Sequence, residues 1–459
     1  MNDKTLFACQ VMTLVVAAAC SQAAWAQTAP AAEQTGTESK APEAVLAPAT
    51  PISSAAQSFD SIFGATINPN QIAFTPSYET SGRASLPGIM TAPAFGAPVR
   101  FGGTYVYPDA VLTYGNNDNL LGTSSNALST RFSNVHTNLV AEVKNDGDRY
   151  TASYTGNYAR FDSSSADNYN HHEFALAGDD TFSSRARLGW TGGYLMNTDP
   201  RGSTDRALSA TPDKWHASSV AALFAYGAQG AIGRFEVESF AQEKRYDNNR
   251  ETTAGGDLDM LNVAGRFLYR VAPKTSILFE LREIKTDYQL NTSTNTNTDR
   301  RVLVGVTWEA TAATTGVIKI GELKKDFDSS ARSDYSGVNW EGSVRWTPLT
   351  YSTIDFNTAR APADSTGVGD YILNRTENVR WTHQWSSATS TKVSLGQVDS
   401  DYHGIDLQEN TRNYGVGISY AWRRWLSLSA ELATTRRTSN VPEQEYKRNV
   451  LSLSLEGTL

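Results

Sequence analysis

The sequence predicts an all-β protein: a transmembrane up-and-down antiparallel β-barrel of about 18 strands, with short periplasmic turns and long extracellular loops. From residue 101 onward, apolar and polar side chains alternate with a period of two, which is typical of strands with one apolar and one wet face. Short turns and long polar loops alternate between these segments, as in barrels of the outer membrane. The final segment, NVLSLSLEGTL, keeps this rhythm to the last residue, although chain ends are ordinarily polar and frayed.

The first 26 residues have the features of a secretory signal peptide. Lys4 precedes a mostly apolar run over residues 6–19, and the small residues of an AWA motif ending at Ala26 form a cleavage site. The run is too short for a membrane-spanning helix, and a polar stretch follows it. An alternative is lipid attachment at Cys20, which follows three alanines in a loose likeness of a bacterial lipobox. We expect cleavage near Ala26 and export from the cytoplasm.

Residues 27–100 are predicted to form a flexible periplasmic segment, and residues 101–459 the barrel. Ala, Pro, Ser and Thr dominate the first of these parts, which has too little apolar surface to fold alone. Both cysteines, Cys9 and Cys20, lie in the leader, so the cleaved chain is expected to hold no disulfide and no thiolate metal site. The formal charge of −8 disfavours a nucleic-acid partner.

A barrel explains the strand pattern better than a soluble sandwich does. In VNWEGSVRW (338–346), for example, the apolar residues occupy one face, and Asn, Glu, Ser and Arg occupy the other. The apolar faces of a sandwich would have to meet each other, whereas a large barrel turns them toward lipid and the polar faces toward a watery lumen. Unpaired backbone groups are costly in lipid, so the last strand is expected to pair with the first and close the sheet.

Turns and aromatic residues define two different ends. Eight tight turns are predicted at the periplasmic end: 145–148, 183–184, 228–231, 272–275, 312–315, 347–350, 386–389 and around Arg423-Arg424. Aromatic girdles are expected at both membrane interfaces. The periplasmic girdle comprises Tyr150, Tyr269, Trp346, Trp385 and Trp422, which lie close to short turns. The extracellular girdle comprises Tyr114, Phe161, Tyr246, Tyr288, Tyr335 and Tyr446, which lie close to long loops.

Charged residues of both signs are predicted to line the pore. The basic candidates are Arg187, Arg266, Arg270, Arg282, Arg345, Arg380 and Arg423. The acidic candidates are Glu142, Glu236, Glu238, Glu280, Glu341 and Glu431. They could form a charged constriction that selects solutes or guides a polar polymer, or a lattice of ion pairs that only satisfies the lumen charges. Aromatic residues on this face are expected to be few, with Phe240 the clearest exception.

No enzyme, metal site or cofactor is predicted. Two groupings of side chains were weighed as catalytic or metal-binding: Asp399, Asp401, His403 and Asp406 in VDSDYHGID, near an outer loop, and His171, His172 and Glu173 in NYNHHEF. Both are expected to be solvated side chains, because six histidines fall near acids by chance and no hydrolase, phosphate-binding or paired-cysteine motif occurs.

The stretch GTYVYPDAVLTYGNNDNLLG carries a family resemblance. Pro108, an alternating strand through Leu112 and Tyr114, and the run from Asn116 to Leu120 resemble the β-barrel porins encoded in exopolysaccharide and capsule loci of Gram-negative bacteria. The meander that follows is generic to large barrels. The resemblance implies an outer-membrane channel that serves export of a polysaccharide and works beside periplasmic export proteins.

The expected function is therefore passive passage of an exopolysaccharide through a hydrated lumen of mixed charge. Two alternatives stay open: a general diffusion porin for small solutes, and a barrel hydrolase or surface adhesin that acts through its long loops. The expected partners are outer-membrane lipid, the barrel-insertion machinery, the polysaccharide and periplasmic export proteins.

Overall fold

The computed structural model describes residues 98–458, apart from 204, 207, 229, 312 and 313, and two short paired strands, β1 (Ser77–Tyr78) and β2 (Ala84–Ser85). The predicted signal peptide, the alternative lipid site at Cys20 and most of the predicted periplasmic segment lie outside the described residues. Among the described residues, none of the helices is long and apolar enough to span a membrane.

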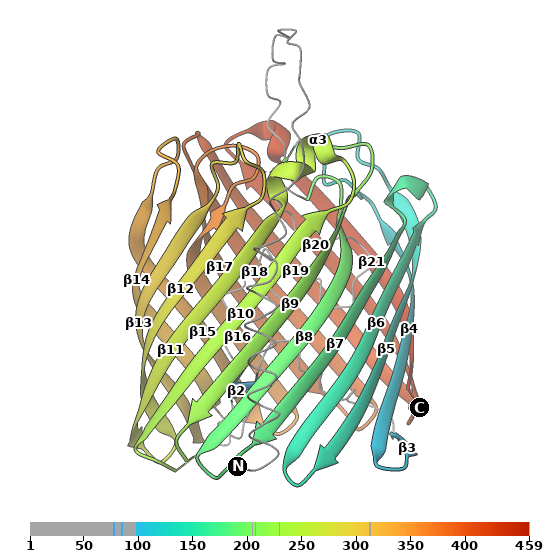
Figure 1. Ribbon diagram of the computed structural model, residues 1–459. Helices are drawn as coiled ribbons and strands as arrows, with labels where there is room; N and C mark the ends of the chain where they lie inside the picture. The colour runs from blue at the N-terminus through green and yellow to red at the C-terminus, as the bar shows by residue number, and fades with distance from the viewer. Residues whose placement is uncertain are drawn as a thin grey trace.

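The described chain forms one closed antiparallel barrel of tilted strands, as Figure 1 shows. A short strand, β3 (Val99–Phe101), precedes it and pairs with the start of β4. The barrel strands are β4 (Thr104–Asn117), β5 (Thr130–Asn145), β6 (Asp148–Phe161), β7 (Tyr169–Thr181), β8 (Ala186–Asp199), β9 (Asp213–Tyr226), β10 (Gly233–Tyr246), β11 (Leu258–Ala272), β12 (Thr275–Tyr288), β13 (Asn297–Thr311), β14 (Thr314–Phe327), β15 (Tyr335–Leu349), β16 (Ser352–Asp364), β17 (Tyr371–Gln384), β18 (Thr389–His403), β19 (Leu407–Arg423), β20 (Leu426–Ser439) and β21 (Tyr446–Thr458). These 18 strands confirm the predicted fold class.

The last strand closes the barrel against the first. Residues Val450 to Thr458 of β21 pair with residues Asn117 to Asp109 of β4, so NVLSLSLEGT is held as a full member of the sheet. Closure leaves neither strand with an open edge, which satisfies the backbone groups that lipid cannot. The alternating C-terminus is therefore explained by pairing across the seam between β21 and β4.

The two-residue rhythm separates an outer from an inner face. On β19, the outward side chains of Val416 and Ile418 are 53% and 51% exposed, and on β21 Leu453 is 60% exposed. The intervening residues Asn413 and Gly415 point inward and are buried. An apolar surface that runs around the whole barrel would be unstable in water, but it matches the hydrocarbon core of a membrane.

Six of the eight predicted tight turns are confirmed, and they lie at one end of the barrel; the turns at 228–231 and 312–315 include residues outside the described part of the chain. The connections at the other end are longer and span 118–129, 162–168, 200–212, 247–257, 289–296, 328–334, 365–370, 404–406 and 440–445. They contain the short helices η3 (Ser165–Asp167), α3 (Arg250–Thr253), η4 (Ala254–Gly256) and η5 (Pro442–Gln444). The connection at 404–406 is an exception to the predicted pattern, because it is as short as the periplasmic turns. The long-loop end corresponds to the extracellular side.

The predicted extracellular aromatic girdle is wrong for five of its six residues. Of the six, Tyr114 alone faces outward, with 53% exposure. The other five are 4–7% exposed and lie against the interior: Phe161, Tyr246, Tyr288, Tyr335 and Tyr446. In the periplasmic set, Tyr269, Trp346, Trp385 and Trp422 are 47–62% exposed, as a girdle requires. Aromatic side chains near the long loops therefore serve the inner wall more than the lipid interface.

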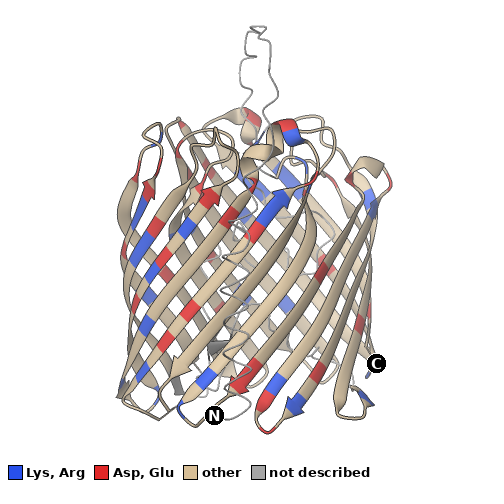
Figure 2. Cartoon of the chain, in the orientation of Figure 1, with Lys and Arg blue, Asp and Glu red and all other residues tan. Residues whose placement is uncertain are grey.

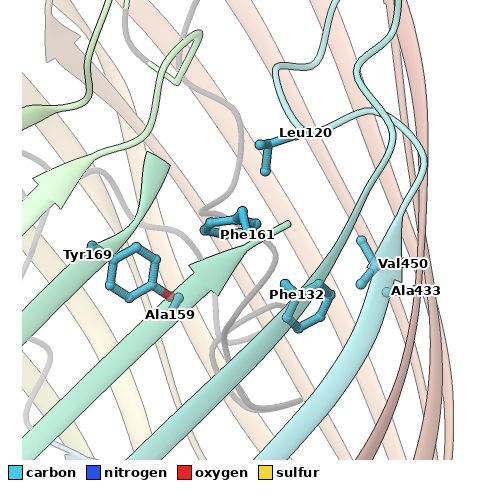
Figure 3. Close-up of a cluster of buried hydrophobic side chains, with 7 residues drawn as sticks. All are labelled: Leu120, Phe132, Ala159, Phe161, Tyr169, Ala433 and Val450. Carbon is cyan, nitrogen blue, oxygen red and sulfur yellow. The ribbon is translucent and has the colours of Figure 1, made fainter. Parts of the chain in front are cut away.

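An apolar cluster covers the inner side of the seam near the extracellular end. It comprises Leu120, Phe132, Ala159, Phe161, Tyr169, Ala433 and Val450, drawn in Figure 3. Phe132 of β5 pairs with Gly115 of β4 and is 1% exposed. A Cβ atom at Gly115 would lie 2.5 Å from the Phe132 ring and 2.6 Å from the carbonyl oxygen of Leu451, so only glycine fits beneath the ring.

The family-like stretch after β4 also belongs to the seam. The backbone nitrogen and carboxylate of Asp118 bond to Asn449 of β21, and the Nδ2 of Asn119 donates to the carbonyl oxygen of Lys447 at 3.0 Å. The Oδ1 of Asn117 accepts from the backbone nitrogen of Asn119 at 3.0 Å. The Asn-Asn-Asp-Asn run thus joins the first and last strands, which gives it a structural role.

Candidate functional site

A lattice of buried ion pairs lines the inner wall from β10 to β15. Arg266 on β11 lies at its centre: its Nη2 is 2.6 Å from Glu238 Oε2, and its Nε is 2.7 Å from Glu280 Oε2. Arg282 continues the lattice, with Nη2 2.6 Å from Glu280 and Nη1 3.3 Å from Glu341. These five side chains are at most 5% exposed.

Two further cations complete the lattice from the neighbouring strands. Lys319 Nζ on β14 lies 3.2 Å from Glu280 and 2.6 Å from Glu341. Arg301 on β13 lies 3.2 Å from Glu341 and also pairs with Asp299 at 2.8 Å. Glu280 and Glu341 therefore each meet three cations, and each of the four cations meets at least two carboxylates.

The charges of this lattice balance. Arg266, Arg282, Arg301 and Lys319 face Glu238, Glu280, Asp299 and Glu341, and Glu236 is held by Arg234 at 2.9 Å. Figure 2 shows acidic and basic residues interspersed over the same strands. Opposite charges therefore neutralise one another within the wall, and a buried charge that lost its partner would cost several kcal/mol. Along β10 to β15 the charged side chains thus form a lattice of ion pairs.

Arg301, Lys319 and Asp299 were missed from the sequence. Lys319 stands between Ile318 and Ile320, and that alternation was sufficient to place it on the wet face. The inner position of Arg301 could not be predicted in this way. The residues that follow it are apolar on both faces of β13, so the sequence does not show which face points inward.

Most of the other predicted pore-lining residues also lie on the inner face by strand register, nearer the periplasmic turns. Glu142 is buried and bonds to Arg149, and Lys144 lies 3.0 Å from it. Arg187 pairs with Asp179, and Arg345 with Asp355 at 2.6 Å. Arg270, Arg380 and Glu431 share the inward register. Arg423 is different: it is exposed at the β19–β20 turn, with its guanidinium 5.5 Å from the Trp422 ring.

A second cluster lies where the strands reach the extracellular mouth. Asp199 at the end of β8 accepts from Trp215 Nε1 at 2.8 Å and from the Tyr246 hydroxyl at 2.6 Å. Lys244 Nζ lies 4.2 Å from the Trp215 ring centroid and donates to the Tyr246 oxygen at 3.0 Å. Arg206 donates to Asp199 and to the Tyr246 hydroxyl oxygen. Aromatic residues on the inner face are therefore more numerous than predicted; Phe240 is also on this face, packed in an apolar cluster.

Arg206 belongs to the mouth loop, which we define as residues 200–212 between β8 and β9. Burial opposes its charge, but Tyr246, Asp199 and Asp213 outweigh burial and hold the pKa of Arg206 above its ordinary value. The Nη2 of Arg206 lies 2.9 Å from Asp213 Oδ2. The charged guanidinium of Arg206 thus fixes the mouth loop to the inner wall beside β8, β9 and β10.

Asp205, the residue before Arg206 in the mouth loop, is bound by the loop between β16 and β17. Its carboxylate accepts hydrogen bonds from the backbone nitrogens of Thr366 and Gly367 at 2.7 and 2.8 Å. The hydroxyls of Ser365 and Thr366 donate to it at 2.9 and 2.6 Å. All three partners lie in the β16–β17 loop, and Asp205 is 5% exposed. Four donors around one carboxylate form a specific and strong latch.

The latch carries the mouth loop across the opening. Eight strands, β9 to β16, separate the two loops on one side of the ring, and ten separate them on the other. The two loops therefore start from nearly opposite walls. Because Arg206 is bound beside the wall where the mouth loop starts, the β16–β17 loop meets the adjacent Asp205 over the opening. The fit between the two loops is close, because a Cβ atom at Gly367 would lie 1.8 Å from the Asp205 carbonyl oxygen.

The base of the mouth loop is held as well. Arg201 bonds to Asp167 of η3, and this hydrogen bond raises the pKa of Arg201. Gly202 has φ of +73° and approaches the β4–β5 loop so closely that a Cβ atom would lie 2.5 Å from the Leu121 carbonyl oxygen. Long polar loops are predicted at this end of the barrel, but the inward course of the mouth loop carries no signature in the sequence.

The histidine groupings do not converge on a site. His403 lies on β18, not in a loop, and stacks on Tyr371 with centroids 4.4 Å apart. His171 contacts Thr198 at 2.7 Å, and His172 contacts the Tyr154 hydroxyl at 2.9 Å. Among residues 98–458 as described, no three His, Cys, Asp or Glu side chains are grouped as a metal site.

The chain is similar to known outer-membrane barrels in sequence and in structure. Residues 93–458 match the model of a family described as "Putative beta-barrel porin 2". No curated protein matches the chain. Among solved structures, a BenF-like porin from Pseudomonas fluorescens Pf-5 is similar at 12% identity and a TM-score of 0.46, over 78% of this chain and all of that one. The outer-membrane protein opdK from Pseudomonas aeruginosa is similar at 11% identity and 0.42, over 77% and 99%. A structure titled "Bacterial polysaccharide outer membrane secretin" is similar at 10% identity and 0.36, over 77% and 98%.

Proposed function

The chain belongs to this porin family and is a porin-like barrel of the outer membrane, and from that premise we propose that it is a passive diffusion channel for small polar and charged solutes. The latch between Asp205 and the β16–β17 loop carries this proposal, because it holds a loop across the mouth. A closed ring of 18 strands encloses a lumen, and an inward loop reduces the size of what can enter it.

The balanced wall supports the same proposal. A lumen with one dominant sign of charge would favour solutes of the opposite sign, whereas interspersed ion pairs favour neither strongly. The expected selectivity is therefore by size and polarity more than by charge. The exposed pair of Arg345 and Asp355, nearer the periplasmic end, continues this mixed lining.

Passage of a polysaccharide is the second candidate. The stretch from Pro108 to Leu120, which resembles barrels encoded in exopolysaccharide loci, favours it. An extended polymer would require the mouth loop to leave its latch, since four hydrogen bonds hold it across the opening. The small-solute function needs no such displacement.

The experiment that tests the proposal compares the full barrel with Asp205→Ala in planar lipid bilayers. Wild-type protein is expected to show small, stable conductance steps, and Asp205→Ala several-fold larger or strongly fluctuating ones. Asp162→Ala, which removes an acid from an exposed pair with Arg131, is the matched control and should leave conductance unchanged. Liposome swelling with mono- and disaccharides measures passage directly.

The outcomes separate the candidates. Swelling with small sugars by wild-type protein supports the diffusion channel. Passage of a polysaccharide, or its block of the current in wild-type protein with no small-sugar swelling, supports the second candidate instead. A barrel with no conductance in either form contradicts both.

A further inference from the structure

The outer face of the seam carries a row of three neighbouring cations. Arg412 on β19 pairs in register with Arg436 on β20, and Arg436 pairs with Lys447 on β21. Register partners lie on one face, and the outward faces of these strands continue into Tyr414, Leu432 and Leu451. We call Arg412, Arg436 and Lys447 the basic row.

No counter-charge is provided for the basic row within the barrel. All three residues are exposed, and among the described residues none of their side chains makes a hydrogen bond or an ion pair. Like charges directly opposite each other on a sheet face are destabilising, with Cβ atoms roughly 5 Å apart. Asp399, two residues beyond the register partner of Arg412, is occupied by Gln397 and Asn410. The row therefore presents concentrated, uncompensated positive charge.

Other outward cations near the same end have partners. Arg300 on β13 lies 2.8 Å from Glu283 and 3.1 Å from Asp326. Lys285 lies 3.0 Å from Asp287, a pair on one strand. Arg300 and Lys285 are thus neutralised by neighbouring acids, whereas the basic row is not.

An apolar groove lies on the outer face of the seam, farther from the extracellular end than the basic row. Its volume is about 700 Å³, and its walls include Leu112, Ile418, Leu428, Leu453 and Leu455. Its floor includes Ala430, which pairs with Ile418 and Leu453 and is too short to fill the space between them. A groove of this composition suits a hydrocarbon chain.

The spacing of the two features matches one leaflet. Ala430 and Arg436 are six residues apart on β20, roughly 20 Å along a strand. With the usual tilt of barrel strands, that is about 15 Å along the membrane normal. One leaflet with its headgroups is about 20 Å thick. The row then lies at headgroup level and the groove among the acyl chains, on the extracellular side.

We propose that the basic row and the groove beneath it form a specific site for a phosphorylated lipid of the outer leaflet. Phosphate binds across Arg412, Arg436 and Lys447, and one acyl chain lies in the groove over Ala430. This site is on the outer face and does not depend on what passes through the lumen. The lipid supplies the counter-charge that the barrel lacks.

Native mass spectrometry of the intact barrel in neutral detergent tests the site, with diphosphoryl lipid A as the probe and its fully dephosphorylated form as comparison. The variants are Arg412→Gln/Arg436→Gln/Lys447→Gln and Ala430→Trp, which fills the groove without changing charge. Their matched controls are Arg300→Gln, an outward arginine already paired, and Ala241→Trp, an outward alanine on β10. Each cation near a phosphate contributes about fivefold in affinity, so the triple variant should lose roughly a hundredfold.

A thermal measurement keeps the test valid if a variant folds poorly. In detergent alone the triple variant should melt at the wild-type temperature or higher, because three repelling charges are gone. With lipid A present, wild-type protein should gain stability and the triple variant should not. A merely structural role would shift both melting curves equally.

Four results would overturn the proposal. The triple variant could retain lipid A as wild-type protein does, the dephosphorylated lipid could bind equally well, or Ala430→Trp could behave as Ala241→Trp. A wild-type dimer that the triple variant loses would assign the row to a second copy of the chain and would also overturn it.

Discussion

The carboxylate of Asp118, just after the first barrel strand, accepts hydrogen bonds from the backbone nitrogen and the Nδ2 of Asn449 in the last strand, at 2.7 and 2.6 Å. The two residues are 331 positions apart in the chain. This contact ties the extracellular end of the seam, where β4 has ended and β21 has not yet begun to pair with it. The run from Asn116 to Leu120, which carries the family resemblance, therefore helps to hold the first and last strands of the barrel together.

Replacement of Asp118 by Ala is expected to weaken closure. It removes two charge-assisted bonds and leaves the Asn449 nitrogens without these partners, a loss of about 2 to 3 kcal/mol. The temperature at which the folded barrel loses its fast mobility in SDS gels measures this effect. Asp162→Ala removes an acid whose pair with Arg131 is more than half exposed, and should change that temperature little. Equal shifts for both variants would contradict the seam role.

Replacement of Arg266 by Met is expected to destabilise the barrel by about 3 to 5 kcal/mol, because Glu238 and Glu280 lose a buried partner. The double change Arg266→Met/Glu238→Gln should recover part of the loss, since one orphaned charge is gone. Denaturant titration of the barrel in detergent measures both. Arg345→Met, whose side chain is 62% exposed, should cost about 1 kcal/mol or less. A double variant no better than the single one would argue against the ion-pair lattice.

Gly367→Ala is expected to reproduce the effect of Asp205→Ala on conductance. The added Cβ atom would fall 1.8 Å from the Asp205 carbonyl oxygen, so the mouth loop must leave its seat although its carboxylate is intact. Single-channel recording should show larger or less stable steps than wild type. Gly192→Ala meets no atom within 4 Å and is the control. Wild-type currents from Gly367→Ala would show that the latch does not set the channel width.

Arg345→Gln is expected to shift ion selectivity toward cations by a modest amount. It removes one positive charge from the inner face and leaves Asp355 without it. Reversal potentials across a salt gradient measure the shift. Arg300→Gln removes an arginine from the outer face and should leave the potential unchanged. Identical shifts would indicate that the overall charge of the protein, not its lumen lining, controls selectivity.

The parts of the fold that follow from a period of two were predictable. Strand faces, turn positions and closure all depend on local alternation, so the assignment of Glu280 or Arg266 to the inner face needed no distant contact. The aromatic prediction failed because it used nearness to the loops and not the phase of the strand. Tyr246 and Tyr288 stand eight residues after Glu238 and Glu280, so the same period of two turns them inward. There their hydroxyls donate to Asp199 and Asp364 of other strands.

The mouth loop could not be predicted for a similar reason. Asp205 is one acidic residue in a polar loop, and its partners stand 160 residues later in the chain. A polar composition of this kind predicts a solvent-exposed loop. The course of the loop depends on the backbone nitrogens of Thr366 and Gly367, and a sequence does not show where these point.

The seam also limits when the barrel can be completed during synthesis. β4 is the first barrel strand to be made and β21 the last, so their nine paired positions can form only after the final residues have been released. A product truncated before residue 450 lacks every β21 partner of β4, so the sheet keeps two open edges. The closing seam is therefore the last part of the sheet to form, and until it forms β4 and β20 present open edges that can pair with other chains.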